Sequence, residues 1–111
     1  MTKLKFGVPC SQLKEFASDA EIPCTSESEA MSLACGAWFA GKTPIVYMQN
    51  SGLGSIIDIV TSLYKPYEIP LPKLVLSLRH KPFHHSFTGK ITKDLLKLLN
   101  YNNVEIIEEI E

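Results

Sequence analysis

The feature that most constrains the fold is a continuous apolar run of strand length, Pro44 to Met48. Unbroken hydrophobicity of this kind is typical of a central parallel strand that is covered on both faces. A second such run, Lys73 to Leu78, follows the proline-rich loop at 65–72. Between and around these runs apolar residues recur at helical spacing, so strands alternate with helices along the chain. This alternation predicts right-handed crossovers and an α/β fold with three α/β/α layers, in which a mainly parallel sheet carries helices on both faces.

The other segments fit the same alternation. Lys3–Val8 predicts a first strand. Ser26 and Glu29 have the spacing of a capping box for a helix that ends at Gly41. The remaining expectations are a strand or a mere connection at 21–24, a helix over about 53–63 capped by Ser51 or Asn50, a histidine-containing loop at 79–89, a helix at 92–99 and a last strand at 104–107.

Composition narrows the functional classes. The 111 residues suffice for a single domain, and the 11 basic and 12 acidic side chains give no electrostatic signature for nucleic acid or an anionic membrane. Three cysteines without CxxC spacing indicate a reducing compartment, so we expect a cytoplasmic protein. No apolar run approaches the roughly 18 residues that a membrane helix needs, and no leader sequence is expected. The helix predicted at 28–40 is apolar on two sides, which favours an oligomer over a monomer.

The residues after each strand are the candidate functional groups, because ligands of open parallel sheets bind beyond the carboxyl ends of the strands. Glu27 follows the short segment that ends at Cys24, and a glutamate there also has the ordinary role of stabilising a helix N-terminus. Asn50-Ser51-Gly52 is equally compatible with a plain helix cap, because it matches neither a dinucleotide fingerprint nor a P-loop.

Cysteine and histidine provide two further options at this edge. Cys10, near a helix start, is a possible nucleophile, but the sequence identifies no partner base for it. His80, His84 and His85 lack acidic or cysteine ligands at useful spacing, so no metal site is predicted on this chain.

Several ordered segments together resemble one known family. They are GVPCSQLKEF, SESEAMSLACGAWFAGKTPIVYMQNSGLGS, TSL, YEIPLPKLVLSLR and GKITKDLLKLL, which run from residue 6 to about residue 99. The set resembles the pyrimidine-binding domain of thiamine-diphosphate-dependent decarboxylases, with VYMQNSGLG as its most specific block. Within that superfamily it is most similar to phosphonopyruvate decarboxylase and the sulfopyruvate decarboxylase alpha subunit.

The resemblance implies a role for most of the candidate residues. It implies that Glu27 hydrogen-bonds the aminopyrimidine of the cofactor and favours the tautomer that removes the thiazolium proton. It also implies that Gln49, Asn50, Ser51 and Gly52 line the cofactor. Substrate contacts are expected from Cys10, Ser11, Arg79, His84 and His85, with His85 also a candidate proton donor.

The chain also departs from the family pattern. Cys10 replaces a usual aspartate, the usual N-terminal helix is missing, and no GDG motif with a downstream asparagine occurs. The resemblance therefore implies a single pyrimidine-type domain, 1–111, of a carboxy-lyase that is inactive without a partner. A beta-type chain would hold Mg²⁺ and share the thiamine diphosphate, and the substrate would be a small 2-oxo acid. The alternatives are a catalytically degenerate assembly or regulatory module and a flavodoxin-like nucleotide binder.

Overall fold

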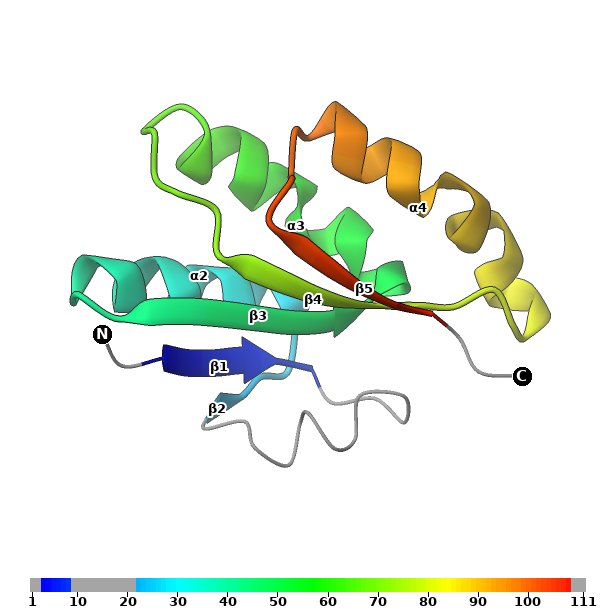
Figure 1. The fold of residues 1–111 in the computed structure, drawn as a ribbon, viewed down its shortest axis with the longest axis horizontal. Coiled ribbons are helices and arrows are strands. Elements are labelled where there is room, and N and C mark those ends of the chain that lie inside the picture. The colour runs from blue at the N-terminus through cyan, green and yellow to red at the C-terminus, as the bar shows by residue number, and fades with distance from the viewer. Residues whose placement is uncertain (1–2, 9–21, 109–111) are drawn as a thin grey trace.

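The computed structural model describes residues 3–8 and 22–108 of the chain. Five strands form one all-parallel sheet in the order β2-β1-β3-β4-β5 (Figure 1). This confirms the predicted α/β class and is compatible with three α/β/α layers. The strands are β1 (Lys3–Gly7), β2 (Ile22–Pro23), β3 (Thr43–Gln49), β4 (Lys73–Leu78) and β5 (Val104–Glu108), and the helices are α2 (Glu27–Phe39), α3 (Leu53–Ile59) and α4 (Ser86–Leu98).

The helices α2, α3 and α4 lie on one face of the sheet. Right-handed crossovers from β2 to β3, β3 to β4 and β4 to β5 all step in the same direction, which places their helices on the same side. Val46, Met48, Leu74 and Leu76 point to this side and form one core with the apolar faces of the three helices. In Figure 1 all three helices accordingly lie to one side of the ribbon of strands.

The centre of the sheet is buried on its other face as well. Ile45, Tyr47 and Val75 alternate with the helix-facing residues, and each is at most 9% exposed. This confirms the prediction that the runs at 44–48 and 73–78 are strands covered on both sides.

Helix α2 is set at both ends by local sequence. The Ser26 hydroxyl accepts a hydrogen bond from the Glu29 amide at 3.1 Å, as the predicted capping box requires. The Glu29 carboxylate in turn accepts from the Thr25 amide at 3.0 Å, one residue before the cap. At the other end Gly41 adopts φ +83°, a left-handed conformation that glycine adopts without strain and that ends the helix where predicted.

The predicted cap of one helix and the predicted start of another were wrong, whereas α3 begins at Leu53 as predicted. Helix α3 has Gly52 as its cap, without any side-chain hydrogen bond, and Asn50–Gly52 forms a 3₁₀ turn before it. Neither Ser51 nor Asn50 caps α3, because the Asn50 side chain turns into the protein. Helix α4 begins at Ser86 and not at Thr92, so the histidine loop is shorter than expected and ends in a 3₁₀ turn at Phe83–His85. Thr92 lies in the middle of that helix and is fully buried.

The second apolar side of α2 is covered largely by the chain itself. Met31 and Cys35 are buried, and the Tyr64 hydroxyl from the turn after α3 donates a 2.6 Å hydrogen bond to the Met31 carbonyl. The apolar side chains of the helix that stay exposed include Leu33 in its middle, which is 41% exposed, and Phe39 at its end, which is 69% exposed. Much of the apolar character that favoured an oligomer is therefore internal packing.

Buried phenols make the fold sensitive to alkali. Burial raises the pKa of Tyr64 and Tyr101 well above the ordinary value of 10.0, and it also raises the pKa of the Cys24 and Cys35 thiols above 9.0. Both hydroxyls donate to backbone carbonyls, that of Tyr101 to Pro72 at 2.7 Å. The unfolded chain loses these protons at a lower pH than the folded chain, so stability declines as pH rises above the unfolded values.

We therefore expect the melting temperature to be level near neutral pH and to fall progressively above about pH 9 to 10, the ordinary thiol and phenol values. Thermal unfolding monitored by circular dichroism at a series of pH values measures this. Tyr101→Phe should make the decline shallower, whereas Tyr67→Phe, at a 72% exposed position, should leave its slope unchanged. A melting temperature that holds constant up to about pH 11.5 would contradict the expectation.

Candidate functional site

The carboxyl ends of the parallel strands meet at one edge of the sheet. The chain order reverses between β1 and β3, since β2 lies on one side of β1 and all later strands lie on the other. Open parallel sheets form a crevice at such a switch point. Glu27 and the segment 49–52 flank this point, and β4 brings Arg79 to the same edge.

Glu27 is the first residue of α2 and presents its carboxylate at this edge. Its side chain is half-buried, and it makes no hydrogen bond or ion pair with any residue that the structure describes. Glu29, two residues later, is occupied at the helix cap. The position of Glu27 satisfies the helix-dipole role expected of a first-turn glutamate, and no residue in the ranges 3–8 and 22–108 occupies its carboxylate oxygens through a hydrogen bond or ion pair.

Gly52 lies within contact distance of the Glu27 side chain. A Cβ atom placed on Gly52 would be 2.5 Å from the Glu27 Cδ and 2.7 Å from its Oε2. The two helix starts are also joined beside this contact, because the Ser28 hydroxyl donates a 2.7 Å hydrogen bond to the Ser55 carbonyl. Glu27 and Gly52 are therefore neighbours at this edge, and the prediction that both contact a cofactor stays a prediction.

Asn50 joins three elements and is fully buried. Its Nδ2 donates to the Arg79 carbonyl at 3.1 Å and to the Thr92 hydroxyl at 3.0 Å. Its Oδ1 accepts from the Arg79 amide at 2.9 Å. We call this set of contacts the Asn50 clasp. It ties the end of β3 to the end of β4 and to α4, so the Asn50 amide serves the architecture of the edge, and the predicted cofactor contact of Asn50 stays a prediction.

The Gln49 side chain contacts polar side chains from three neighbouring segments. Its Oε1 accepts from Arg79 Nη1 at 3.3 Å, and its Nε2 donates to the Ser51 hydroxyl at 3.1 Å. The same Nε2 lies 3.5 Å from His85 Nε2. Four of the predicted site residues, Gln49, Ser51, Arg79 and His85, therefore form one cluster although up to 36 positions separate them. We call it the Gln49 cluster.

The two adjacent histidines differ in their surroundings. Their ring centres are 4.1 Å apart, but His85 is only 7% exposed whereas His84 is exposed. Only His85 therefore joins the Gln49 cluster. Within the described residues, no group of three or more His, Cys, Asp or Glu side chains is arranged to hold a metal ion. Cys10 and Ser11, the other predicted substrate contacts, lie outside the described residues.

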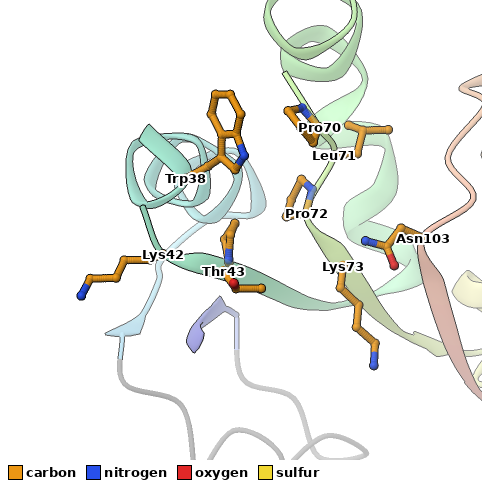
Figure 2. A pocket seen from close by; sticks show the side chains of 9 residues that line it. Trp38, Lys42, Thr43, Pro70, Leu71, Pro72, Lys73 and Asn103 are labelled. Carbon is orange, nitrogen blue, oxygen red and sulfur yellow. The ribbon is translucent and has the colours of Figure 1, made fainter. Parts of the chain in front are cut away.

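A hollow of about 280 Å³ lies at the opposite edge, where strands begin (Figure 2). Trp38 at the end of α2 faces Pro70 and Pro72 across the hollow. The amino groups of Lys42 and Lys73 point away from the space between Trp38 and the prolines. The Lys73 ammonium is instead paired with Glu105 at 3.0 Å. This hollow is apolar and remote from Glu27, so it does not belong to the candidate site.

Sequence reasoning missed the contacts of two residues that shape the site, Thr92 and Ser28. The sequence places Thr92 at a helix start, and it predicts no contact for Ser28. Their partners Asn50 and Ser55 lie 42 and 27 positions away, so no local pattern indicates the pairing. A polar residue among apolar helix positions, such as Thr92, is the one available signal.

The amino-acid sequence of the chain is similar to those of three curated decarboxylase proteins. It is 36% identical over 106 residues to the sulfopyruvate decarboxylase subunit alpha of Methanothermobacter thermautotrophicus, which covers 84% of this chain and 62% of the relative. It is 43% identical over 71 residues to the subunit of the same name from Methanocaldococcus jannaschii, covering 58% of this chain and 42% of the relative. It is 38% identical over 104 residues to the phosphonopyruvate decarboxylase of Streptomyces viridochromogenes, covering 83% of this chain and 26% of the relative.

These similarities confirm the predicted resemblance to sulfopyruvate decarboxylase alpha subunits and phosphonopyruvate decarboxylases. The chain spans about three fifths of the length of the Methanothermobacter subunit and about a quarter of the length of the Streptomyces enzyme. No family model matches the chain. No helix in the described ranges has the length and apolar character needed to cross a membrane.

Proposed function

We propose, on the premise that this chain is a homologue of sulfopyruvate decarboxylase alpha subunits and phosphonopyruvate decarboxylases, that it is the alpha-type subunit of a 2-oxo acid decarboxylase. In this proposal the enzyme depends on thiamine diphosphate, and its substrate is sulfopyruvate, phosphonopyruvate or a similar acid. Two relatives carry the words "subunit alpha" in their names, which supports a partner chain for this one.

The observation that carries the proposal is the position of the Glu27 carboxylate at the switch-point edge. A half-buried carboxylate without a partner in the described part of the protein is suited to share a proton with a ring nitrogen of a ligand. Gly52 has no side chain, and the space this leaves is occupied by the Glu27 side chain, which lies at the same edge. The residues present therefore fit the aminopyrimidine end of the cofactor.

The proposed roles of the chain follow from these positions. Glu27 hydrogen-bonds the ring nitrogen and holds or releases its proton, which sets the tautomer of the aminopyrimidine. When bound, thiamine diphosphate supplies the carbon nucleophile and the electron sink for decarboxylation. The Gln49 cluster brings Arg79 and His85 beside the cofactor edge, where a cationic guanidinium and an imidazole favour an anionic substrate.

The remainder of the site is assigned to a partner. In our proposal a beta-type chain holds the diphosphate and Mg²⁺ and closes the crevice over Glu27. Covering Glu27 in this way would exclude water from the site of the proton transfer.

Reconstitution tests this assignment. The chain should release no carbon dioxide from sulfopyruvate or phosphonopyruvate when it is alone. It should release carbon dioxide when it is co-purified with a beta-type, diphosphate-binding chain in the presence of thiamine diphosphate and Mg²⁺. Pyruvate, which lacks the second anionic group, is the matched control substrate and should react more slowly. If the two chains form a stable complex that decarboxylates none of the three acids, the enzyme proposal is contradicted and the assembly module is favoured.

A further inference from the structure

The contact between Gly52 and Glu27 is closer than any residue with a side chain would allow at position 52. The Glu27 side chain occupies the space where a Cβ on Gly52 would lie, and the conflict would involve its Cγ, Cδ and Oε2 atoms together. Real Cβ atoms essentially never approach other heavy atoms to 2.5 Å, the distance to the Glu27 Cδ. Any substitution at position 52 must therefore move the Glu27 side chain or the backbone beneath it.

The need for glycine at this position comes from space and not from backbone conformation. Gly52 has φ −80° and ψ −9°, which any residue adopts. Gly54, two residues further on, has open space around it, because a Cβ placed there would meet no heavy atom within 4 Å. A side chain at position 52 would therefore collide with Glu27, whereas a side chain at position 54 would not.

The backbone around the contact is fixed, so the side chain is the part that would give way. Ser28, next to Glu27, is hydrogen-bonded to the Ser55 carbonyl on α3 at 2.7 Å. Ser26 caps the same helix start. Leu53, next to Gly52, is fully buried in the core. Since both helix starts are held, a Cβ at position 52 would displace the only half-exposed group in the contact, the Glu27 carboxylate.

We infer that Gly52 is a positioning residue for Glu27: its missing side chain leaves the space in which the Glu27 carboxylate rests and so sets the direction in which that carboxylate faces a ligand. This differs from a glycine that merely lets a cofactor approach the backbone. The kinetic test of the inference rests on the function proposed above, but the structural test does not.

The structural test compares Gly52→Ala with Gly54→Ala in the isolated chain. A crystal structure of Gly52→Ala should show the Glu27 carboxylate moved off position 52 with the helix starts unchanged, and Gly54→Ala should leave Glu27 where it is. If Gly52→Ala fails to fold, Gly52→Ala combined with Glu27→Ala should fold, because the conflicting atoms are gone. A displaced α3 with Glu27 in place, or a double variant that also fails to fold, would overturn the inference.

The kinetic test uses the reconstituted complex. Gly52→Ala should lower kcat about tenfold with the substrate KM within about twofold, since a misplaced carboxylate affects the proton step more than substrate binding. Gly54→Ala should keep the wild-type kcat. In the Glu27→Ala background Gly52→Ala should cause no further loss, whereas an additional loss there would mean that Gly52 contacts the cofactor on its own and would overturn the positioning role. An inactive wild-type complex would count against the proposed function and leave the crystallographic result standing.

Discussion

Replacing Glu27 by glutamine should lower the decarboxylation rate of the reconstituted complex by about 100-fold or more. Glutamine has nearly the same shape and keeps an oxygen that can accept a hydrogen bond, but it cannot take or give the proton that sets the tautomer of the ring. The loss should appear in kcat, with the cofactor still bound, because the packing over Gly52 is kept. Carbon dioxide release at saturating thiamine diphosphate, followed together with calorimetric cofactor binding, measures both quantities.

Glu29→Gln is the matched control for this substitution. It removes the same charge from the first turn of α2, yet its amide oxygen can still accept from the Thr25 amide as the carboxylate does. Because Glu29 is exposed and occupied at the helix cap, the variant should keep the wild-type rate within about twofold. Equal losses in the two variants would show that the charge at the helix end matters and the Glu27 carboxylate does not, and a fully active Glu27→Gln would remove Glu27 from the mechanism.

Replacing Asn50 by alanine should destabilise the folded chain by about 3 kcal/mol. The Asn50 clasp contains three hydrogen bonds around a side chain with no exposed surface. Truncation would leave the Arg79 amide and carbonyl without these partners and would open a cavity where the amide had been. Urea unfolding should give a lower midpoint with an unchanged slope, and the melting temperature should fall by more than about 10 °C.

Asn102→Ala provides the corresponding control. Asn102 is exposed, and its Nδ2 donates to the Asn100 side chain at 3.2 Å. The free energy of unfolding should therefore change by less than about 0.5 kcal/mol. If Asn50→Ala were as stable as Asn102→Ala, the clasp would not be what joins β3, β4 and α4. The Asn50 variant should also loosen Arg79 and reduce activity toward anionic substrates, since Arg79 follows directly from the clasp.

The clasp and the Gln49 cluster indicate how the edge is organised. Asn50 turns inward and fixes the backbone of Arg79, while Gln49 on the preceding position turns outward and contacts the Arg79 guanidinium. Gln49 is the last residue of β3 and Asn50 is the first residue of the 3₁₀ turn, so the strand ends between them. One of the two residues therefore supports the site, and the other is available to line it.

Sequence alone determined the features that depend on neighbouring residues. The strands at 43–49 and 73–78, the cap at Ser26 and the stop at Gly41 all follow from apolar runs and local hydrogen bonds. The location of Glu27 at the start of a helix beyond a strand follows from the same local signals. The similarity to decarboxylase subunits was also indicated by ordered motifs along the chain.

Only the tertiary structure decided what the polar side chains do. Asn50 had the sequence pattern of a helix cap and became a buried clasp, because Arg79 and Thr92, distant in sequence, meet it at the sheet edge. His84 and His85 are adjacent in sequence, yet only His85 is buried against Gln49. Gly52 has an ordinary backbone conformation, and the reason for a glycine there is the Glu27 side chain that occupies the place of its Cβ. Patterns of hydrophobicity record which face of an element is buried, but the partner of a buried polar group is set by the meeting of elements that the local sequence does not encode.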